Sequence, residues 1–152
     1  MIGLFEGTLQ QLAVIALFMT VLSGEAGNMA TQAITTVVRG LATGDVHPSE
    51  LARVVGREMA TGLILGLPVG AILMVTVGIW KGDWVLAAVI GLALCLTLPI
   101  AAGLGGFFPI IIERLGIDPA VSSGPFITTL TDVISMCVYF GLVTATLPLL
   151  LR

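Results

Sequence analysis

Residues 124–151 read GPFITTLTDVISMCVYFGLVTATLPLLL, a run apolar enough to cross a lipid bilayer that nevertheless carries one carboxylate, Asp132. At a rise of about 1.5 Å per residue, a helix of about 20 apolar residues crosses the hydrocarbon core. A charged side chain that faces lipid at mid-membrane costs at least about 2.5 to 3.5 kcal/mol, so Asp132 is expected to face protein or water. The stretch predicts a transmembrane helix that carries a functional acid.

The whole chain has the same apolar character. Its 152 residues are 57% hydrophobic and only 10% charged, with a mean hydropathy of +1.14, whereas soluble domains have a charged fraction near one quarter. This composition predicts a membrane protein whose surroundings are mainly the lipid bilayer. The net charge of -3 is small and dispersed, and the sequence has no basic patch, so no nucleic-acid partner is expected. Cys95 and Cys137 lie in apolar runs without C-x-x-C spacing, so neither a disulfide nor a thiolate metal site is predicted.

Three polar segments interrupt the hydropathy, and each combines charges with Gly, Pro or other turn formers. They are RGLATGDVHPSEL at 39–51, WKGDW at 80–84 and ERLGIDPAVSSGP at 113–125. The segments between them predict an all-α, polytopic membrane protein with one transmembrane domain over residues 1–152. Its four long helices are expected at about 8–40, 49–79, 84–113 and 122–151.

The basic residues are distributed unevenly among the loops. The segments at 39–51 and 113–125 contain or adjoin all the arginines except Arg152, whereas the segment at 80–84 contains only Lys81. By the positive-inside rule, the first and third loops are expected to be cytoplasmic, and loop 80–84 and the C-terminus external. Residues 1–9 resemble a loop that follows an earlier helix, and we therefore expect an upstream span to be missing.

Two of the predicted helices carry polar or small residues at spacings of three or four, which places them on one helical face. In the first helix this face contains Gly24, Asn28, Thr31, Thr35 and Arg39, with Glu25 and Gln32 beside it. In the last helix it contains Gly124, Thr128, Asp132, Ser135 and Tyr139. We expect the two faces to meet.

The sequence favours a definite role for one of the two acids inside the membrane and leaves the role of the other open. No arginine lies at the depth of Asp132, so a functional role is favoured over an ion pair that only packs helices. For Glu25 two interpretations stay open: it faces the same cavity as Asp132 and attracts a cation, or it is protonated and bonds between helices. Glu58 lies beside Arg53 and Arg57, where an ion pair is expected. Glycines 62, 66 and 70 have the spacing that lets helices pack closely, within or between chains.

Acids and hydroxyls without cationic residues at the same depth suit a cation pathway. A carrier that couples a cation to H⁺ or Na⁺ through Glu25 and Asp132 is the main alternative, and a purely structural membrane subunit is a third. Catalytic residues are not predicted, because the sequence has no G-x-G-D motif and its single histidine, His47, lies in a loop. The chain is therefore not expected to be an enzyme.

Two segments resemble the MgtE family of magnesium channels. GNMATQAITTVVRGLATGDV at 27–46 is similar to that family's G-N-x-x-[TS]-Q and V-V-R-G-L-A-x-G-[DE] signature. DPAVSSGPFITTLTDV at 118–133 is similar to its D-P-A and P-[FL]-[IV]-x-T-x-x-D segment. The resemblance covers essentially the whole chain, from the loop after the family's first membrane helix to the end of its fifth.

The resemblance implies a homodimeric Mg²⁺ channel of the plasma (inner) membrane, with a pore on the two-fold axis lined by the first and last helices. Asp132 would bind hydrated Mg²⁺, one carboxylate from each subunit. Gly124 and Thr128 would line the pore toward the cytoplasm, and the motif around Asn28 would face the last helix. Gly24, Thr31 and Thr35 are the other expected pore-lining residues.

Two departures from the family pattern carry expectations of their own. The sequence GEAGN places Glu25 where the family has no acid, so Glu25 would alter selectivity or add an ion site. Typical members also carry a cytoplasmic acidic helical domain and paired CBS domains. Neither is present in these 152 residues, so no closure of the pore by such domains is expected.

Overall fold

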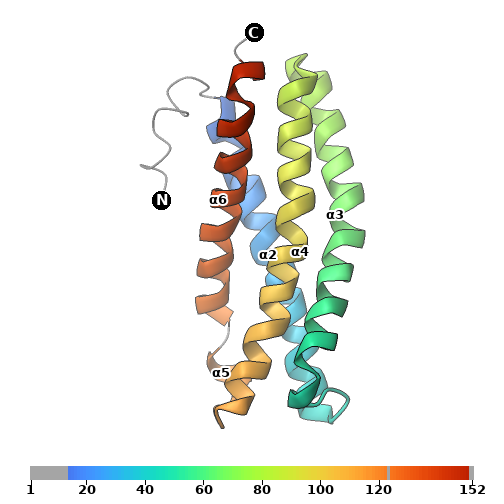
Figure 1. The fold of residues 1–152 in the computed structure, drawn as a ribbon, viewed down its shortest axis with the longest axis vertical. Coiled ribbons are helices and arrows are strands. Elements are labelled where there is room, and N and C mark those ends of the chain that lie inside the picture. The colour runs from blue at the N-terminus through green and yellow to red at the C-terminus, as the bar shows by residue number, and fades with distance from the viewer. Residues whose placement is uncertain (1–13, 123, 151–152) are drawn as a thin grey trace.

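The computed structural model describes residues 14–122 and 124–150, which form a bundle of long helices (Figure 1). The described residues contain four long helices and no strand: α2 (Val14–Thr43), α3 (Leu51–Lys81), α4 (Trp84–Arg114) and α6 (Gly124–Leu150). Two short elements, the 3₁₀-helix η2 (Pro48–Glu50) and α5 (Pro119–Ser122), lie in the connections. The predicted all-α class and the four long helices are confirmed.

Glycines and one capping aspartate set the helix ends. Gly44 and Gly82 have φ angles of 80° and 70°, a left-handed conformation that ends a helix at little cost in glycine. Asp83 then caps α4, because its carboxylate accepts hydrogen bonds from the N–H groups of Val85 and Leu86. The third helix therefore begins at Trp84, as predicted.

The first predicted helix, 8–40, needs a correction at its C-terminal end, which lies at Thr43. Gly40 does not end the helix: a Cβ atom at this position would lie 2.7 Å from the side chain of Val46. The glycine therefore allows the following loop to fold back onto the helix. Residues 8–13 of the prediction lie outside the described residues.

Helix α4 is the centre of the bundle. It contacts α2, α3 and α6, whereas α2 and α3 barely touch each other, and Figure 1 shows α4 between α3 and α6. The sequence explains this position, because α4 carries no charged residue between Trp84 and Glu113. Its one polar side chain at depth, Thr97, is buried and donates a hydrogen bond to the carbonyl of Ala93. A helix that is apolar on all sides is expected to be the most buried one.

The predicted glycine seam lies within the chain, between α3 and α4. A Cβ atom at Gly62 would lie 2.7 Å from the carbonyl oxygen of Leu98, and one at Gly70 would lie 2.8 Å from that of Gly91. The two backbones therefore approach each other closely, as small residues permit in membrane helices. Of the two interpretations left open for this motif, the structure supports packing within one chain.

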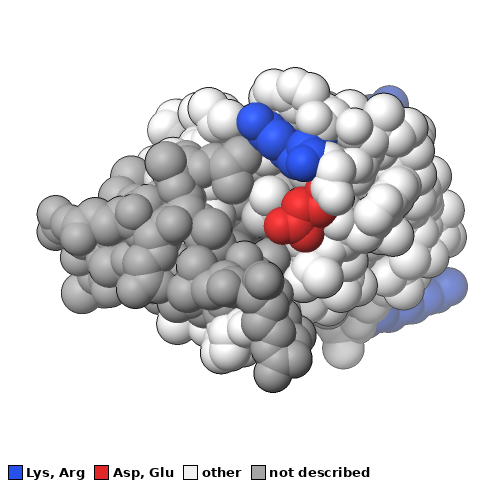
Figure 2. Space-filling model, turned by 90° about the horizontal axis from the view of Figure 1, so that it is seen from above, with Lys and Arg blue, Asp and Glu red and all other residues white. Residues whose placement is uncertain are grey.

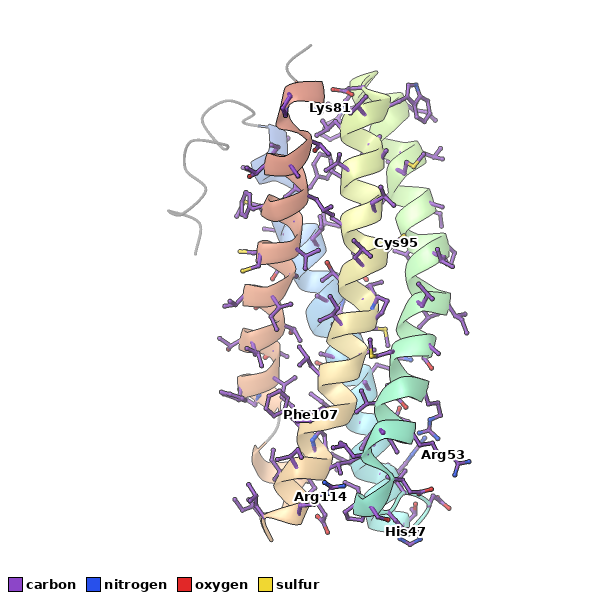
Figure 3. The ribbon with its side chains drawn as sticks, in the orientation of Figure 1. His47, Arg53, Lys81, Cys95, Phe107 and Arg114 are labelled. Atoms are coloured by element: carbon purple, nitrogen blue, oxygen red, sulfur yellow. The ribbon has the colours of Figure 1, made fainter. Side chains whose placement is uncertain are left out.

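The outer surface of the bundle fits a lipid environment, and the chain is an integral membrane protein. Helices α3, α4 and α6 are each long and apolar enough to cross a membrane. On α3, Ile64, Ile72 and Ile79 are 69%, 67% and 74% exposed, so this face suits contact with acyl chains. Labelled charged side chains lie at the two ends of the bundle (Figure 3). The view from above shows a small basic and a small acidic patch among uncharged atoms (Figure 2).

Helix α2, whose 30 residues are about 45 Å long as an α-helix, carries a polar face. Its residues Gly24, Asn28, Thr31, Thr35 and Arg39 are exposed in the single chain. This uncovered polar face is the feature that a function must explain.

Candidate ion-binding site

The carboxylate of Asp132 lies where α6 meets α2. The Ser23 hydroxyl donates a hydrogen bond of 2.6 Å to Asp132 Oδ1, and a Cβ atom at Gly27 would lie 3.9 Å from the same oxygen. Asp132 is half-buried and lies eight residues after the first residue of α6, or about 12 Å along the helix. Helices α2 and α6 therefore meet at Asp132, but through Ser23 and Gly27, which lie beside the predicted α2 face rather than on it.

Ser23 is a site residue that the sequence analysis missed. It lies one helical turn before Gly27, so the two residues present a small surface on the same side of α2. That small surface leaves room for the carboxylate of a neighbouring helix. The spacing of a serine and a glycine four residues apart was the available signal.

The upper part of the predicted α6 face is closed by packing. Ser135 and Tyr139 are both fully buried. The Ser135 hydroxyl donates to the carbonyl of Asp132 at 2.9 Å, and the Tyr139 hydroxyl donates to the carbonyl of Ile15 at 2.9 Å. Tyr139 therefore fastens α6 to α2, whereas the Ser135 bond lies within α6.

A cavity of about 430 Å³ lies between α2 and the start of α6. It brings together three of the predicted pore-lining residues, Thr31, Thr35 and Gly124. Its other lining residues are Ile34, Val38, Arg39, Ala42 and Ala120. The cavity lies between the Asp132 contact and the ends of the helices at Gly124 and Arg39. Its lining is mainly apolar, with Thr31, Thr35 and Arg39 as its polar side chains.

The threonines of this surface bond to their own helices. The Thr31 and Thr35 hydroxyls donate to the carbonyls of Gly27 and Thr31 at 2.8 Å each. The Thr128 hydroxyl lies 3.2 Å from the carbonyl oxygen of Gly124 and 3.0 Å from that of Pro125. A hydroxyl that donates its proton to a carbonyl still has acceptor lone pairs. The surface therefore offers acceptors, which are the groups that the water hydrogens around a hydrated cation require.

Glu25 lies on a different surface of α2 from the one that contacts Asp132. Two helical residues after Ser23 correspond to a rotation of about 200°, which turns Glu25 away from α6. Glu25 and Asn28 line a cavity of about 160 Å³ together with residues of α3 and α4, among them Leu65 and Leu98. Within one chain the structure therefore does not bring Glu25 to Asp132. It also places Asn28, which the resemblance implied would face the last helix, beside Glu25.

Gly24 is exposed, and no atom lies within 4 Å of a Cβ atom built on it. It therefore lies on open surface between the residues that meet Asp132 and those that line the Glu25 cavity. Across residues 14–122 and 124–150, no three His, Cys, Asp or Glu side chains converge as metal ligands do. In a single chain Asp132 thus supplies one carboxylate and no closed ligand set.

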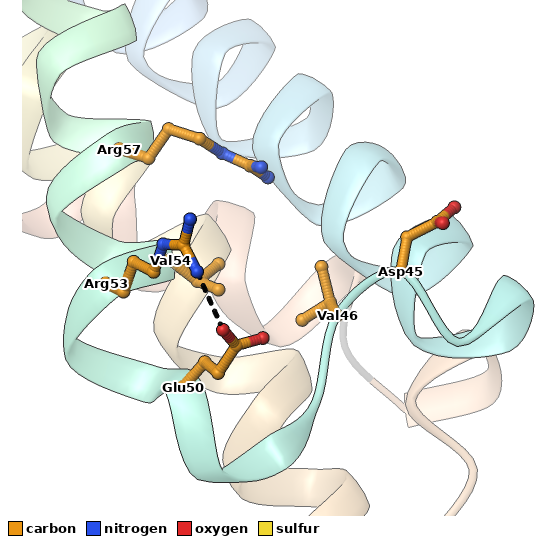
Figure 4. A pocket seen from close by; sticks show the side chains of 6 residues that line it. All are labelled: Asp45, Val46, Glu50, Arg53, Val54 and Arg57. Atoms are coloured by element: carbon orange, nitrogen blue, oxygen red, sulfur yellow. Dashed lines mark hydrogen bonds and ion pairs between the residues drawn. The ribbon is translucent and has the colours of Figure 1, made fainter.

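Arg53 and Arg114 lie at the opposite end of the bundle from Lys81 (Figure 3). A cavity of about 160 Å³ at this end is lined by Asp45, Glu50, Arg53 and Arg57 with two valines (Figure 4). Arg53 pairs with Glu50 at 3.0 Å, and Arg57 pairs with the buried Glu58 at 3.2 Å. The ion pair predicted for Glu58 is confirmed, with Arg57 as its partner.

Comparison with known proteins agrees with this architecture. The family model MgtE, described as "Divalent cation transporter", matches residues 19–142. The "Magnesium transporter MgtE" of Bacillus subtilis strain 168 is 38% identical over 144 residues, which are 95% of this chain and 32% of the relative. Proteins of the same name from Enterococcus faecalis and Thermus thermophilus are 37% and 36% identical, over 93% and 90% of this chain and 31% and 30% of theirs.

The chain thus spans about a third of the length of the curated relatives it matches. The matched residues include α3, α4 and almost all of α2, together with Asp132 and its partner Ser23. The family model covers well over half of the chain. The chain belongs to the MgtE family of divalent cation transporters.

Proposed function

We propose that this chain forms a homodimeric channel that conducts Mg²⁺ across the membrane, with a pore lined by α2 and α6 of both subunits. One observation carries the proposal: α2 has an uncovered polar face, and Asp132 lies at its edge, bonded to Ser23. Polar residues at membrane depth face other protein or a water-filled cavity. A second copy related by a two-fold axis covers both faces at once and supplies a second carboxylate.

The chemistry of the surface suits a hydrated divalent ion. Mg²⁺ releases its waters reluctantly and is usually held by one or two carboxylates through its water shell. Its octahedral shell of about six waters occupies about 180 Å³, less than the cavity of about 430 Å³ beside Gly124. Asp132 would attract the ion, while the Thr31, Thr35 and Thr128 hydroxyls accept hydrogen bonds from its waters. The relatives named as magnesium transporters support this choice of ion.

The orientation that we propose follows from the charge distribution. Arg39, Arg53, Arg57 and Arg114 belong to the end with the α2–α3 and α4–α5 connections, which the positive-inside rule places in the cytoplasm. At the other end Trp80 and Trp84 are 62% and 55% exposed. Exposed tryptophans are typical of the membrane–water interface. In a bacterial cell this arrangement corresponds to the inner membrane.

The transport proposal is tested by Mg²⁺ uptake into liposomes that contain the purified chain, followed with an entrapped Mg²⁺-sensitive dye. A Mg²⁺ gradient alone is expected to drive uptake, at a rate that does not change when the Na⁺ and H⁺ gradients are abolished. Uptake that requires either gradient would instead support the coupled carrier. Within one chain Glu25 and Asp132 have different neighbours, which favours the channel over a carrier that uses both acids.

The dimer is tested with a short thiol-to-thiol cross-linker in a background with Cys95→Ala and Cys137→Ser. Thr31→Cys on the polar face is expected to give a cross-linked dimer, because the two copies of this residue would face each other across the pore. Ile64→Cys, on the 69% exposed apolar face of α3, is the matched control and should remain a monomer. Equal cross-linking of the two variants would contradict the proposed axis.

A further inference from the structure

The cavity that contains Glu25 has a polar side and an apolar side. The polar side consists of Glu25, Asn28 and Gln32 from α2. The apolar side consists of Met29 of α2, Leu65 and Val69 of α3, and Leu98 of α4. We propose that this cavity binds a monovalent cation, Na⁺, at a site distinct from the Asp132 site.

The three polar residues form one stripe. They occupy positions i, i+3 and i+7 of α2, so they share one side of the helix within an arc of about 60°. Along the helix axis they cover about 10 Å, with the short Asn28 side chain between two long ones. One carboxylate and two amide carbonyls are thus offered to the same small volume of about 160 Å³.

The protein itself does not satisfy these groups. None of the described residues hydrogen-bonds or ion-pairs with the side chains of Glu25, Asn28 or Gln32, and no Arg, Lys or His lines the cavity. Glu25 is half-buried and lies eleven residues after the first described residue of α2, about 17 Å along the helix. A bound cation would stabilise a carboxylate at that depth beside the apolar side chains of Leu65, Val69 and Leu98.

The charge at the site favours a monovalent ion. A single carboxylate neutralises one positive charge, whereas a divalent ion would leave a net charge of +1 in a largely apolar cavity. Mg²⁺ also keeps its water shell, and Leu65, Val69 and Leu98 offer no acceptors to that shell. Carboxylate and amide oxygens that contact a dehydrated ion suit Na⁺ better. The Glu25 and Asp132 sites therefore differ in the ion that they select.

The test is thermal unfolding of the purified full chain in detergent, in NaCl and in choline chloride at matched ionic strength. A ligand that binds only the folded state raises Tm, and we expect saturating NaCl to raise it by about 5 °C. Glu25→Gln should abolish this rise, and Asp132→Asn should retain it. In choline chloride, Glu25→Gln should unfold at or above the temperature of the parent, because it lacks an unpaired charge.

Three results would overturn the proposal. One is the absence of a sodium-specific rise in the parent, including a Tm that responds to pH but not to Na⁺, as a protonated Glu25 would give. Another is a rise that survives in Glu25→Gln. The last is a rise that Asp132→Asn removes as well. Equilibrium binding of radioactive sodium is expected to give one ion per chain in the parent and in Asp132→Asn. This measurement does not depend on the uptake assay, so it tests the sodium site separately from the proposed channel.

Discussion

Mg²⁺ uptake is expected to fall by at least about 100-fold when Asp132 is replaced by Asn. The substitution keeps the size of the side chain and its hydrogen bond with Ser23 but removes the negative charge. At an effective dielectric constant of about 20 and a separation of about 5 Å, one carboxylate attracts a divalent ion by about 7 kcal/mol. The water shell and the cost of ion entry offset part of this energy, but each 1.4 kcal/mol that remains is a factor of ten. The liposome assay measures the loss directly.

Asp45→Asn is the matched control for this prediction. It removes the same charge from an exposed position at the end of the bundle, where the Thr43 hydroxyl donates to the carboxylate. Its uptake rate should stay within a factor of about two of the parent. If Asp132→Asn folds normally and conducts as well as Asp45→Asn, the proposed pore does not pass Asp132.

Replacing Gly105 with Leu is expected to lower Tm by at least about 5 °C and to abolish uptake. A Cβ atom at Gly105 would lie 2.5 Å from the carbonyl oxygen of Ala30 and 2.8 Å from Cβ of Ala33. The leucine therefore has to push α2 away from α4. Overpacking of this kind costs about 1 to 3 kcal/mol or more, and about 1 kcal/mol shifts Tm by about 2 to 4 °C in a chain of this size.

The loss of uptake follows from the position of α2, because that helix carries the polar face of the site. Gly141→Leu adds the same volume to α6 at an exposed position with no atom within 4 Å of its Cβ. That variant should unfold and conduct as the parent does. Thermal unfolding and uptake measured on the same preparations compare the two variants, and a Gly105→Leu protein as stable as Gly141→Leu would show that α2 and α4 are not closely packed.

The helices could be predicted from sequence because the signals that define them are local. The charged and glycine-containing segments at 39–51, 80–84 and 113–125 separate apolar runs, and the structure places its helix ends in or beside these segments. The one clear shift, from residue 40 to Thr43, arose because Gly40 packs against Val46. A glycine needed for a close contact and a glycine that ends a helix look alike in a sequence.

The meeting of α2 and α6 could also be predicted, because both helices carry polar faces that lipid would not tolerate. The arrangement around that contact could not. The helical periodicity predicts on which side of α2 Glu25 lies, but it does not predict which helix packs against that side. The close contact of Gly105 with Ala30 decides it, because it brings α4, and with it α3, to the Glu25 side. Ser23 was missed because a lone serine in an apolar run resembles a packing residue.

The turn between α3 and α4 has a consequence for how the protein is made. Only Gly82 and Asp83 separate the two helices, and the glycine seam holds their backbones together along much of their length. Nearly all contacts of α3 are with α4, so this helical hairpin is a nearly complete unit before α6 is synthesised. We expect α3 and α4 to enter the membrane as a pair. Helix α2 then packs against α4, and α6 completes the proposed ion-binding surface.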